Sequence, residues 1–244
     1  MMALHGWDWL WAILAALIVG ISKAGIGGLG MLAVVIFAQL MPAKEATGMV
    51  LPLLCCGDFL AAAAYRQHAK WQHIRRLFPW TAAGVVLGYF ALDLINERQA
   101  RWLIGSIVLS LAGLHLRRRW SVVGESMHGA WFAPTVGVLA GFTTLVANAA
   151  GPLMAVYLLA MRMPKMDFVG TGAVFFLLLN LFKVPFMMHL GLINAASFSL
   201  NLLLFPLVFV GAWLGRKWVM KIDQRGFENI ALALSIIAGI KLLF

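Results

Sequence analysis

Five glycines and one lysine interrupt a long apolar run near the start of the chain. The stretch Gly20-Ile-Ser-Lys-Ala-Gly-Ile-Gly-Gly-Leu-Gly30 lies in the middle of the apolar residues 10–41. Glycine costs ~1 kcal/mol in a helix interior, and a lysine at bilayer depth costs at least ~2.5 kcal/mol. Non-helical backbone at that depth is tolerated where protein buries it or where it lines a wet cavity. We therefore predict two half-helices that meet at a break facing a site.

Such a break favours an anion as ligand. A half-helix that begins near Ile26 would direct its free N–H groups and its positive dipole end into the site, with Lys23 beside them. Gly25, Gly27 and Gly28 are too closely spaced to form a single helix-packing face, which also favours the break. The alternatives are that Lys23 extends to the membrane surface and that the glycines serve close helix packing.

A second polar break recurs further along the chain. Two short apolar segments, residues 131–146 and 149–161, are interrupted at Ala147-Asn-Ala-Ala-Gly-Pro152. The residues that would hold an oxyanion there are Thr143, Thr144, Asn148 and Gly151. The alternative for the hydroxyl and amide side chains is hydrogen bonding between helices, which is common in membranes.

Three further polar residues lie inside apolar segments. Asp58 is an acid in the interior of residues 46–65, and an ionisable residue within a membrane segment is a functional candidate by default. It would act either as a counter-ion for a lysine or as a proton acceptor in coupling. Asn180 and Lys183 lie within residues 168–188, where Lys183 either binds the anion, pairs with an acid or reaches a headgroup.

Composition places the chain in the membrane. Its 244 residues are 63% hydrophobic and 11% charged, whereas soluble domains are about 25% charged. Residues 129–161 and 184–215 contain no Asp, Glu, Lys or Arg. The formal charge of +10 comes from short basic clusters between apolar runs, which indicates the positive-inside signal rather than nucleic-acid binding. The composition predicts an all-α integral membrane protein.

The segments fall into two halves with the same plan. Each half is predicted to contain a broken or re-entrant helical hairpin followed by three transmembrane helices. The hairpins are expected at 7–22 with 26–41 and at 131–146 with 149–161; the crossings are expected at 46–65, 77–95, 102–116, 168–188, 195–213 and 227–244. The predicted repeats are residues 1–119 and 127–244, joined by a linker at 120–126.

Matching residues support an internal repeat. Pro42, Glu45, Gly48 and Asp58 match Pro164, Asp167, Gly170 and Asn180 at a constant offset of 122 residues. Pro79, Gly84, Gly88 and Asn96 match Pro206, Gly211, Gly215 and Asp223 at an offset of 127. The loop at 66–76 is strongly basic, whereas its equivalent at 189–194 has no Lys or Arg. Equivalent loops are therefore predicted on opposite faces, which is an inverted-topology repeat.

The two broken segments resemble a known family. Gly20-x-x-Lys-Ala-Gly-Ile-Gly-Gly28 and Gly141-Phe-Thr-Thr-Leu-Val-Ala-Asn-Ala-Ala-Gly-Pro152 are similar to the two repeat signatures of the TauE/SafE sulfite exporter family. The resemblance covers essentially the whole chain. It implies a multi-pass permease of the bacterial inner membrane for sulfite, sulfonates or related sulfur anions.

We predict a transporter that holds the anion between the two breaks and works by alternating access, with proton coupling through Asp58 and a homodimeric assembly as further expectations. A passive anion channel is the first alternative. An intramembrane enzyme would need a nucleophile with a base or a metal triad, and the apolar segments offer one deep aspartate. We therefore expect neither an enzyme nor a cofactor, metal or nucleic-acid site. A purely structural role would leave the buried Lys and Asp unexplained.

Overall fold

The computed structural model describes residues 6–23, 29–120 and 130–218, together with Ala233, Ile236, Ile237 and Ile240. Within these ranges the chain is helical apart from short connections and forms no strand. In chain order the elements are α1 Trp7–Ser22, α2 Leu29–Leu40, α3 Ala43–Tyr65, the 3₁₀ turn η1 Arg66–His68, α4 Trp71–Leu94, α5 Glu97–Trp120, α6 Phe132–Ala147, α7 Gly151–Ala160, α8 Lys165–His189 and α9 Ala195–Trp218.

Four of the described helical segments are long and apolar enough to cross a bilayer, which needs ~20 residues. They are Ala43–His68, Trp71–Leu94, Met166–His189 and Ala195–Gly215. They confirm the predicted all-α membrane fold and four of its predicted crossings. The crossing predicted at 102–116 lies within α5, which has 24 residues but is not one of the four. The crossing predicted at 227–244 lies outside the described residues except for four positions.

The helices on either side of each predicted break are short. Helix α1 ends at Ser22 and α2 begins at Leu29, so Gly25, Gly27 and Gly28 lie outside the described residues. In the second half, α6 ends at Ala147 and α7 begins at Gly151. Here Asn148 ends the helix in the left-handed conformation, with φ 50° and its N–H bonded to the Thr144 carbonyl. The predicted interruption at 147–152 is therefore present.

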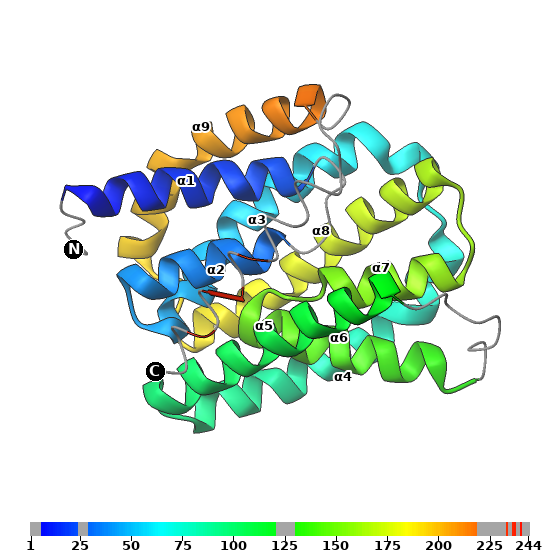
Figure 1. Ribbon diagram of the computed structural model, residues 1–244, viewed down its shortest axis with the longest axis horizontal. Coiled ribbons are helices and arrows are strands. Elements are labelled where there is room, and N and C mark those ends of the chain that lie inside the picture. The colour runs from blue at the N-terminus through cyan, green and yellow to red at the C-terminus, as the bar shows by residue number, and fades with distance from the viewer. Residues whose placement is uncertain are drawn as a thin grey trace.

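Helices α6 and α7 form a hairpin whose outer ends meet. The ring of Phe132, at the start of α6, stacks on that of Tyr157 in α7, with centroids 6.0 Å apart. The Tyr157 hydroxyl also lies 3.3 Å from Nδ1 of His73, at the start of α4. The chain therefore enters from one end of the molecule, turns at Asn148 and returns to the same end. Figure 1 shows α1 and α2 as a similar pair at the opposite end, beside the turn into α3.

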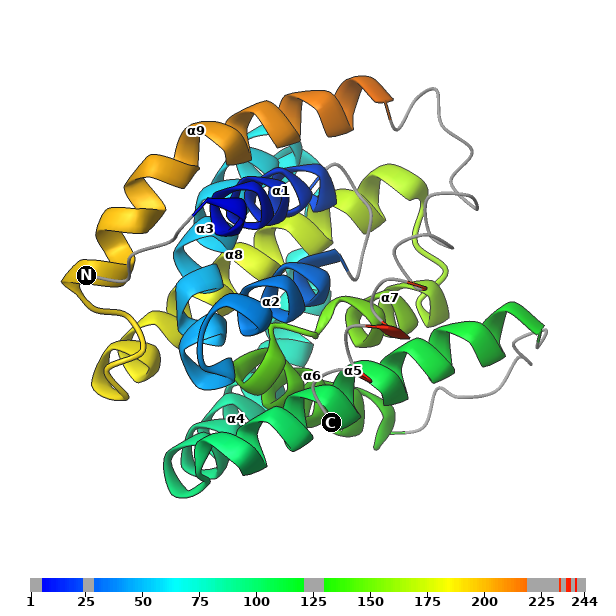
Figure 2. The ribbon, with the colours of Figure 1, turned by 60° about the vertical axis from the view of Figure 1, so that its left-hand side comes forward.

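Helices α3 and α8 lie at the centre and run in opposite directions. On one side of them α1 packs against α9, and on the other side α4 packs against α6 (Figures 1 and 2). A Cβ at Gly48, near the start of α3, would lie 2.6 Å from the Cβ of Leu192. A Cβ at Gly170, near the start of α8, would lie 2.6 Å from the Tyr65 carbonyl oxygen. Gly48 and Gly170, which are related by the offset of 122, thus make close contacts at opposite ends of the α3–α8 pair.

The two outer interfaces use equivalent residues. A Cβ at Gly20 would lie 2.6 Å from the backbone nitrogen of Ala212. A Cβ at Gly141 would lie 2.8 Å from the backbone nitrogen of Val85. Ala212 follows Val85 by the sequence offset of 127, and Gly141 follows Gly20 by 121 residues. In each of these two interfaces a short helix, α1 or α6, therefore packs against a long helix, α9 or α4, with backbones close enough that only glycine fits.

This close packing gives a stability prediction. Gly141→Ala would place a methyl group against the backbones of Gly84 and Val85, which cannot rotate away, and overpacking of this kind costs ~1–3 kcal/mol. The control is Gly113→Ala in α5, where a Cβ meets nothing within 4 Å and helix propensity improves by up to ~1 kcal/mol. We expect the melting temperature in detergent to fall for the first variant only. Equal shifts for both would contradict the interface.

Large apolar side chains cover much of the outer surface of the helices. Phe59, Leu94, Leu203 and Trp213 are each at least 60% exposed. A soluble protein rarely leaves such side chains in contact with water over a wide area, whereas lipid accommodates them. Together with the four long apolar helices, this surface marks a multi-pass membrane protein.

Candidate functional site

A carboxylate, an ammonium and an amide meet in the interior of the central helices. Asp58 of α3 is 1% exposed, and its Oδ1 lies 2.6 Å from Nζ of Lys23, the residue that follows α1. Nδ2 of Asn180, in α8, donates a 2.6 Å hydrogen bond to the other carboxylate oxygen. Both oxygens of Asp58 are therefore engaged, and the charge of Lys23 is balanced inside the protein.

A glycine makes room for Lys23. A Cβ at Gly57 would lie 2.8 Å from Cγ of Lys23, so a larger residue there would displace the lysine stem. The ammonium lies 5.7 Å from the centroid of the Phe176 ring, within the range of a cation–π contact. The side chain of Lys23 is only 13% exposed. It points into the protein rather than toward the membrane surface.

Lys183, one turn beyond Asn180 in α8, is the second lysine of this region and is fully inaccessible to solvent. Its Nζ donates hydrogen bonds to three oxygens: Oγ1 of Thr144 at 3.1 Å, Oδ1 of Asn148 at 2.5 Å and Oδ1 of Asn180 at 3.0 Å. All three acceptors are neutral. Within the described ranges, the nearby carboxylate of Asp58 forms its ion pair with Lys23 and not with Lys183.

Asn148 connects Lys183 to the break between α6 and α7. Its carbonyl oxygen accepts from Lys183, and its Nδ2 donates a 2.9 Å hydrogen bond to the Thr47 carbonyl of α3. These two contacts hold the left-handed turn against α3 and α8. Helix α7 begins three residues later at Gly151; because Pro152 has no N–H, the groups without an acceptor inside the helix are the N–H groups of Gly151 and Leu153. The positive end of a helix dipole thus begins close to a buried lysine.

The structure brings six of the predicted site residues into one hydrogen-bonded network. They are Lys23, Asp58, Thr144, Asn148, Asn180 and Lys183. The hydroxyl of Thr143 instead donates to carbonyl oxygens of its own helix, at Leu139 and Ala140. Gly151 starts α7, while Gly25, Gly27 and Gly28 lie outside the described residues. Side chains from α3 and α8 therefore connect Lys23, at the end of α1, with Asn148, at the end of α6.

Two positions of the interior are not singled out by the sequence. Gly57 makes room for Lys23, and only its place next to Asp58 hints at this role. Asn201 of α9 is fully buried, and neither polar atom of its amide has a partner among the described residues. It lies on the same buried face of α9 as Leu204 and Val208. From the sequence alone, a single asparagine in an apolar helix does not indicate whether its side chain is buried.

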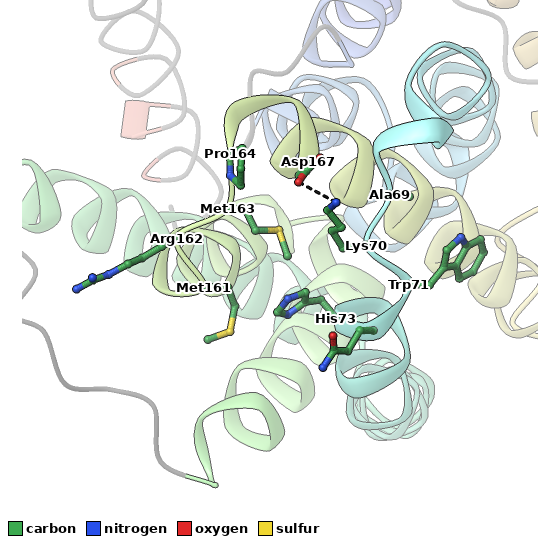
Figure 3. A pocket seen from close by; sticks show the side chains of 10 residues that line it. Ala69, Lys70, Trp71, His73, Met161, Arg162, Met163, Pro164 and Asp167 are labelled. Carbon is green, nitrogen blue, oxygen red and sulfur yellow. Dashed lines mark ion pairs between the residues drawn. The ribbon is translucent and has the colours of Figure 1, made fainter.

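A pocket of about 350 Å³ opens at the end of the molecule where α3 is connected to α4. It lies between residues 69–73 and residues 161–167, so segments from both halves line it (Figure 3). Nζ of Lys70 lies 3.1 Å from Oδ2 of Asp167, which joins the two walls. His73 in this pocket contacts Tyr157 of the α6–α7 hairpin. The pocket therefore lies at the outer end of the hairpin whose turn carries Asn148.

Comparisons with known proteins assign the chain to a family. The described residues contain no cluster of three His, Cys, Asp or Glu side chains that would hold a metal. Neither the curated proteins nor the solved structures include a match to the chain. The family model described as "Sulfite exporter TauE/SafE" matches residues 12–242, nearly the whole chain. That family consists of membrane transporters of sulfur anions rather than enzymes, and the protein described here belongs to the TauE/SafE sulfite exporter family.

Proposed function

We propose that the protein is a secondary transporter that moves small sulfur-containing anions, such as sulfite or organosulfonates, across the bacterial inner membrane. The observation that carries this proposal is Lys183, a fully buried lysine whose hydrogen-bond partners are all neutral. A buried charge without a counter-ion is costly, and a bound anion offsets that cost. Family membership supports the class of anion.

The charges of the network support a site centred on Lys183 rather than on Lys23. Asp58 neutralises Lys23, so this pair carries no net charge. Residues 24–28, which follow Lys23, contain no charged side chain. The anion would bind beside Lys183 at the start of α7, where unpaired N–H groups and the helix dipole add to the attraction. Lys23 would hold Asp58 in place and shape the opposite wall.

The same contacts support an inverted repeat and alternating access. Asp58 and Asn180, which match at the sequence offset of 122, contact each other, as we expect of equivalent residues that lie next to a two-fold axis between α3 and α8. The α1–α9 and α4–α6 interfaces use equivalent glycines. Transporters of this plan bind substrate near the midplane, between broken helices, and move one repeat against the other. With the basic loop at 66–76 in the cytoplasm, the 350 Å³ pocket would open to that side.

Asn148→Asp tests the proposed function. This isosteric change places a carboxylate on the oxygen position that lies 2.5 Å from Nζ of Lys183, so the protein then supplies its own anion. We expect saturable uptake of sulfite into proteoliposomes to fall at least about tenfold, the factor that ~1.4 kcal/mol produces, while the melting temperature stays or rises.

Asn194→Asp is the matched control, because Asn194 is exposed in the loop before α9 and caps that helix through Ser197. The same chemical change there should leave uptake at the level of the parent. Unchanged uptake by Asn148→Asp would remove Lys183 from the substrate site. Uptake that never saturates in the parent would favour an anion channel instead.

A further inference from the structure

The hydrogen bonds of Asp58 and Lys183 indicate which of these two groups gains and loses a proton during transport. This inference rests on the transport function proposed above. The titratable groups that face Lys183 are Lys23 at the end of α1 and Cys55 and Asp58 of α3. Helix α6 faces it with Thr144 and with Asn148 at its end. Helix α4 packs on α8 near this point with the aromatic ring of Phe78, and the nearest titratable α4–α8 contact, Tyr89 with His189, lies at the far end of α8. Lys23 and Asp58 form an ion pair, so among the described groups that face this point only the Lys183 amine itself and the Cys55 thiol lie outside one.

Asp58 is poorly placed to take up and release a proton during transport. A proton on Oδ1 would break the 2.6 Å ion pair with Lys23. A proton on Oδ2 would set an O–H group against the N–H of Asn180 that already donates to this oxygen. Either step would leave a buried polar group without its partner. The bonding therefore favours Asp58 as the lasting counter-ion of Lys23.

Lys183 has partners that suit both of its protonation states. As an ammonium it donates to Thr144, Asn148 and Asn180. As a neutral amine it retains two N–H donors, which the two asparagine carbonyl oxygens accept, and gains one lone pair. A threonine hydroxyl both donates and accepts, so the Thr144 O–H turns toward that lone pair. The loss of one proton therefore needs only the rotation of one hydroxyl group.

We propose that Lys183 is neutral in the empty site and binds one proton each time the site binds a monovalent anion. The proton comes from water on the side where the anion enters, forms the third N–H bond of the ammonium, and leaves with the anion on the other side. The empty site then holds the Lys23–Asp58 ion pair, which has no net charge, and the neutral amine of Lys183. The loaded site holds that pair, the Lys183 ammonium and the anion. Both states are electroneutral, so the transported species is an anion together with a proton.

The test uses proteoliposomes that contain the parent protein and a pH-sensitive dye. The probes are methanesulfonate, which keeps one negative charge at every pH used, and sulfite. We expect about one proton to enter with each methanesulfonate ion. We also expect the uptake rate to be independent of the membrane potential, which a potassium gradient with valinomycin sets to different values. At low methanesulfonate, the initial rate falls by up to about tenfold per pH unit as the external pH rises, as linkage requires for one coupled proton.

Two variants identify the proton carrier. Lys183→Arg keeps a permanent cation, so any uptake that it retains should be independent of pH and should move net charge. Cys55→Ala removes the neighbouring thiol and should leave the proton movement unchanged. Loss of proton movement in Cys55→Ala would assign the proton to the thiol and overturn the proposal.

The outcomes separate this inference from the transport function. Saturable methanesulfonate uptake that carries net charge and no proton would overturn the role of Lys183 as proton carrier and leave the transport function standing. Saturable uptake of neither probe by the parent would overturn both. If Lys183→Arg does not fold, the movement of protons and of charge by the parent still tests the proposal, because those measurements need no variant.

Discussion

Lys183→Met is expected to abolish saturable uptake of sulfite by proteoliposomes. Methionine keeps the length and the apolar stem of the side chain but removes the ammonium that lies among three neutral oxygens. A hydrogen bond to a charged group contributes ~1.5–3 kcal/mol, so anion affinity should fall by about 10- to 150-fold. The fold should survive, because methionine fills much the same space and no ion pair is broken.

Lys217→Met serves as the matched control for that variant. Lys217 is exposed near the end of α9, where its ammonium lies 5.0 Å from the centroid of the Trp213 ring. The same substitution there should leave uptake unchanged. Normal saturable uptake by Lys183→Met would mean that the anion binds elsewhere, and the site would have to be sought beside Lys23.

Asp58→Asn is expected to cause the largest loss of stability. It removes the carboxylate from a pair in which the Lys23 side chain is 13% exposed and that of Asp58 is 1% exposed. Breaking a buried ion pair by removing one partner costs ~3–5 kcal/mol, because the remaining charge stays buried. The apparent melting temperature in detergent should therefore fall well below that of the parent.

The double variant Lys23→Met with Asp58→Asn separates the ion pair from other effects. Because it leaves no unpaired charge, it should be more stable than Asp58→Asn alone. Melting temperatures of the parent, both single variants and the double variant complete the cycle. Strictly additive shifts would show that the 2.6 Å contact contributes little. We also expect Lys23→Met to impair uptake, because Asp58 would lose the group that holds it in place.

Much of the fold is predictable because polar residues are so costly at membrane depth. A lysine, an aspartate and closely spaced glycines within apolar runs indicate a site even when nothing else is known. The match of Asp58 with Asn180 at a fixed offset places both at the same depth of their helices. The structure then brings these two residues into direct contact.

The detailed bonding of the site depends on packing that the sequence does not encode locally. Asp58 has two lysines near it, and only the crossing of α3 and α8 decides that Lys23 pairs with it while Lys183 faces neutral oxygens. Thr143 and Thr144 are adjacent, yet they differ by about 100° around the helix, so one bonds its own backbone and the other bonds Lys183. The space beside Gly57 that Lys23 occupies likewise forms only when α1 packs on α3.

Anion-induced thermal stabilisation of the purified protein is the most direct test of a buried site for a sulfur anion. The measurement compares sulfite, thiosulfate, sulfate, methanesulfonate, small carboxylates and chloride, for the parent and for Asn148→Asp. A ligand that binds only the folded state stabilises it by RT ln(1 + [L]/Kd), so even a weak substrate registers at high concentration. We predict that a sulfur anion raises the melting temperature of the parent and raises that of Asn148→Asp much less. Stabilisation by a carboxylate alone, or equal stabilisation of both proteins, would contradict the proposed site.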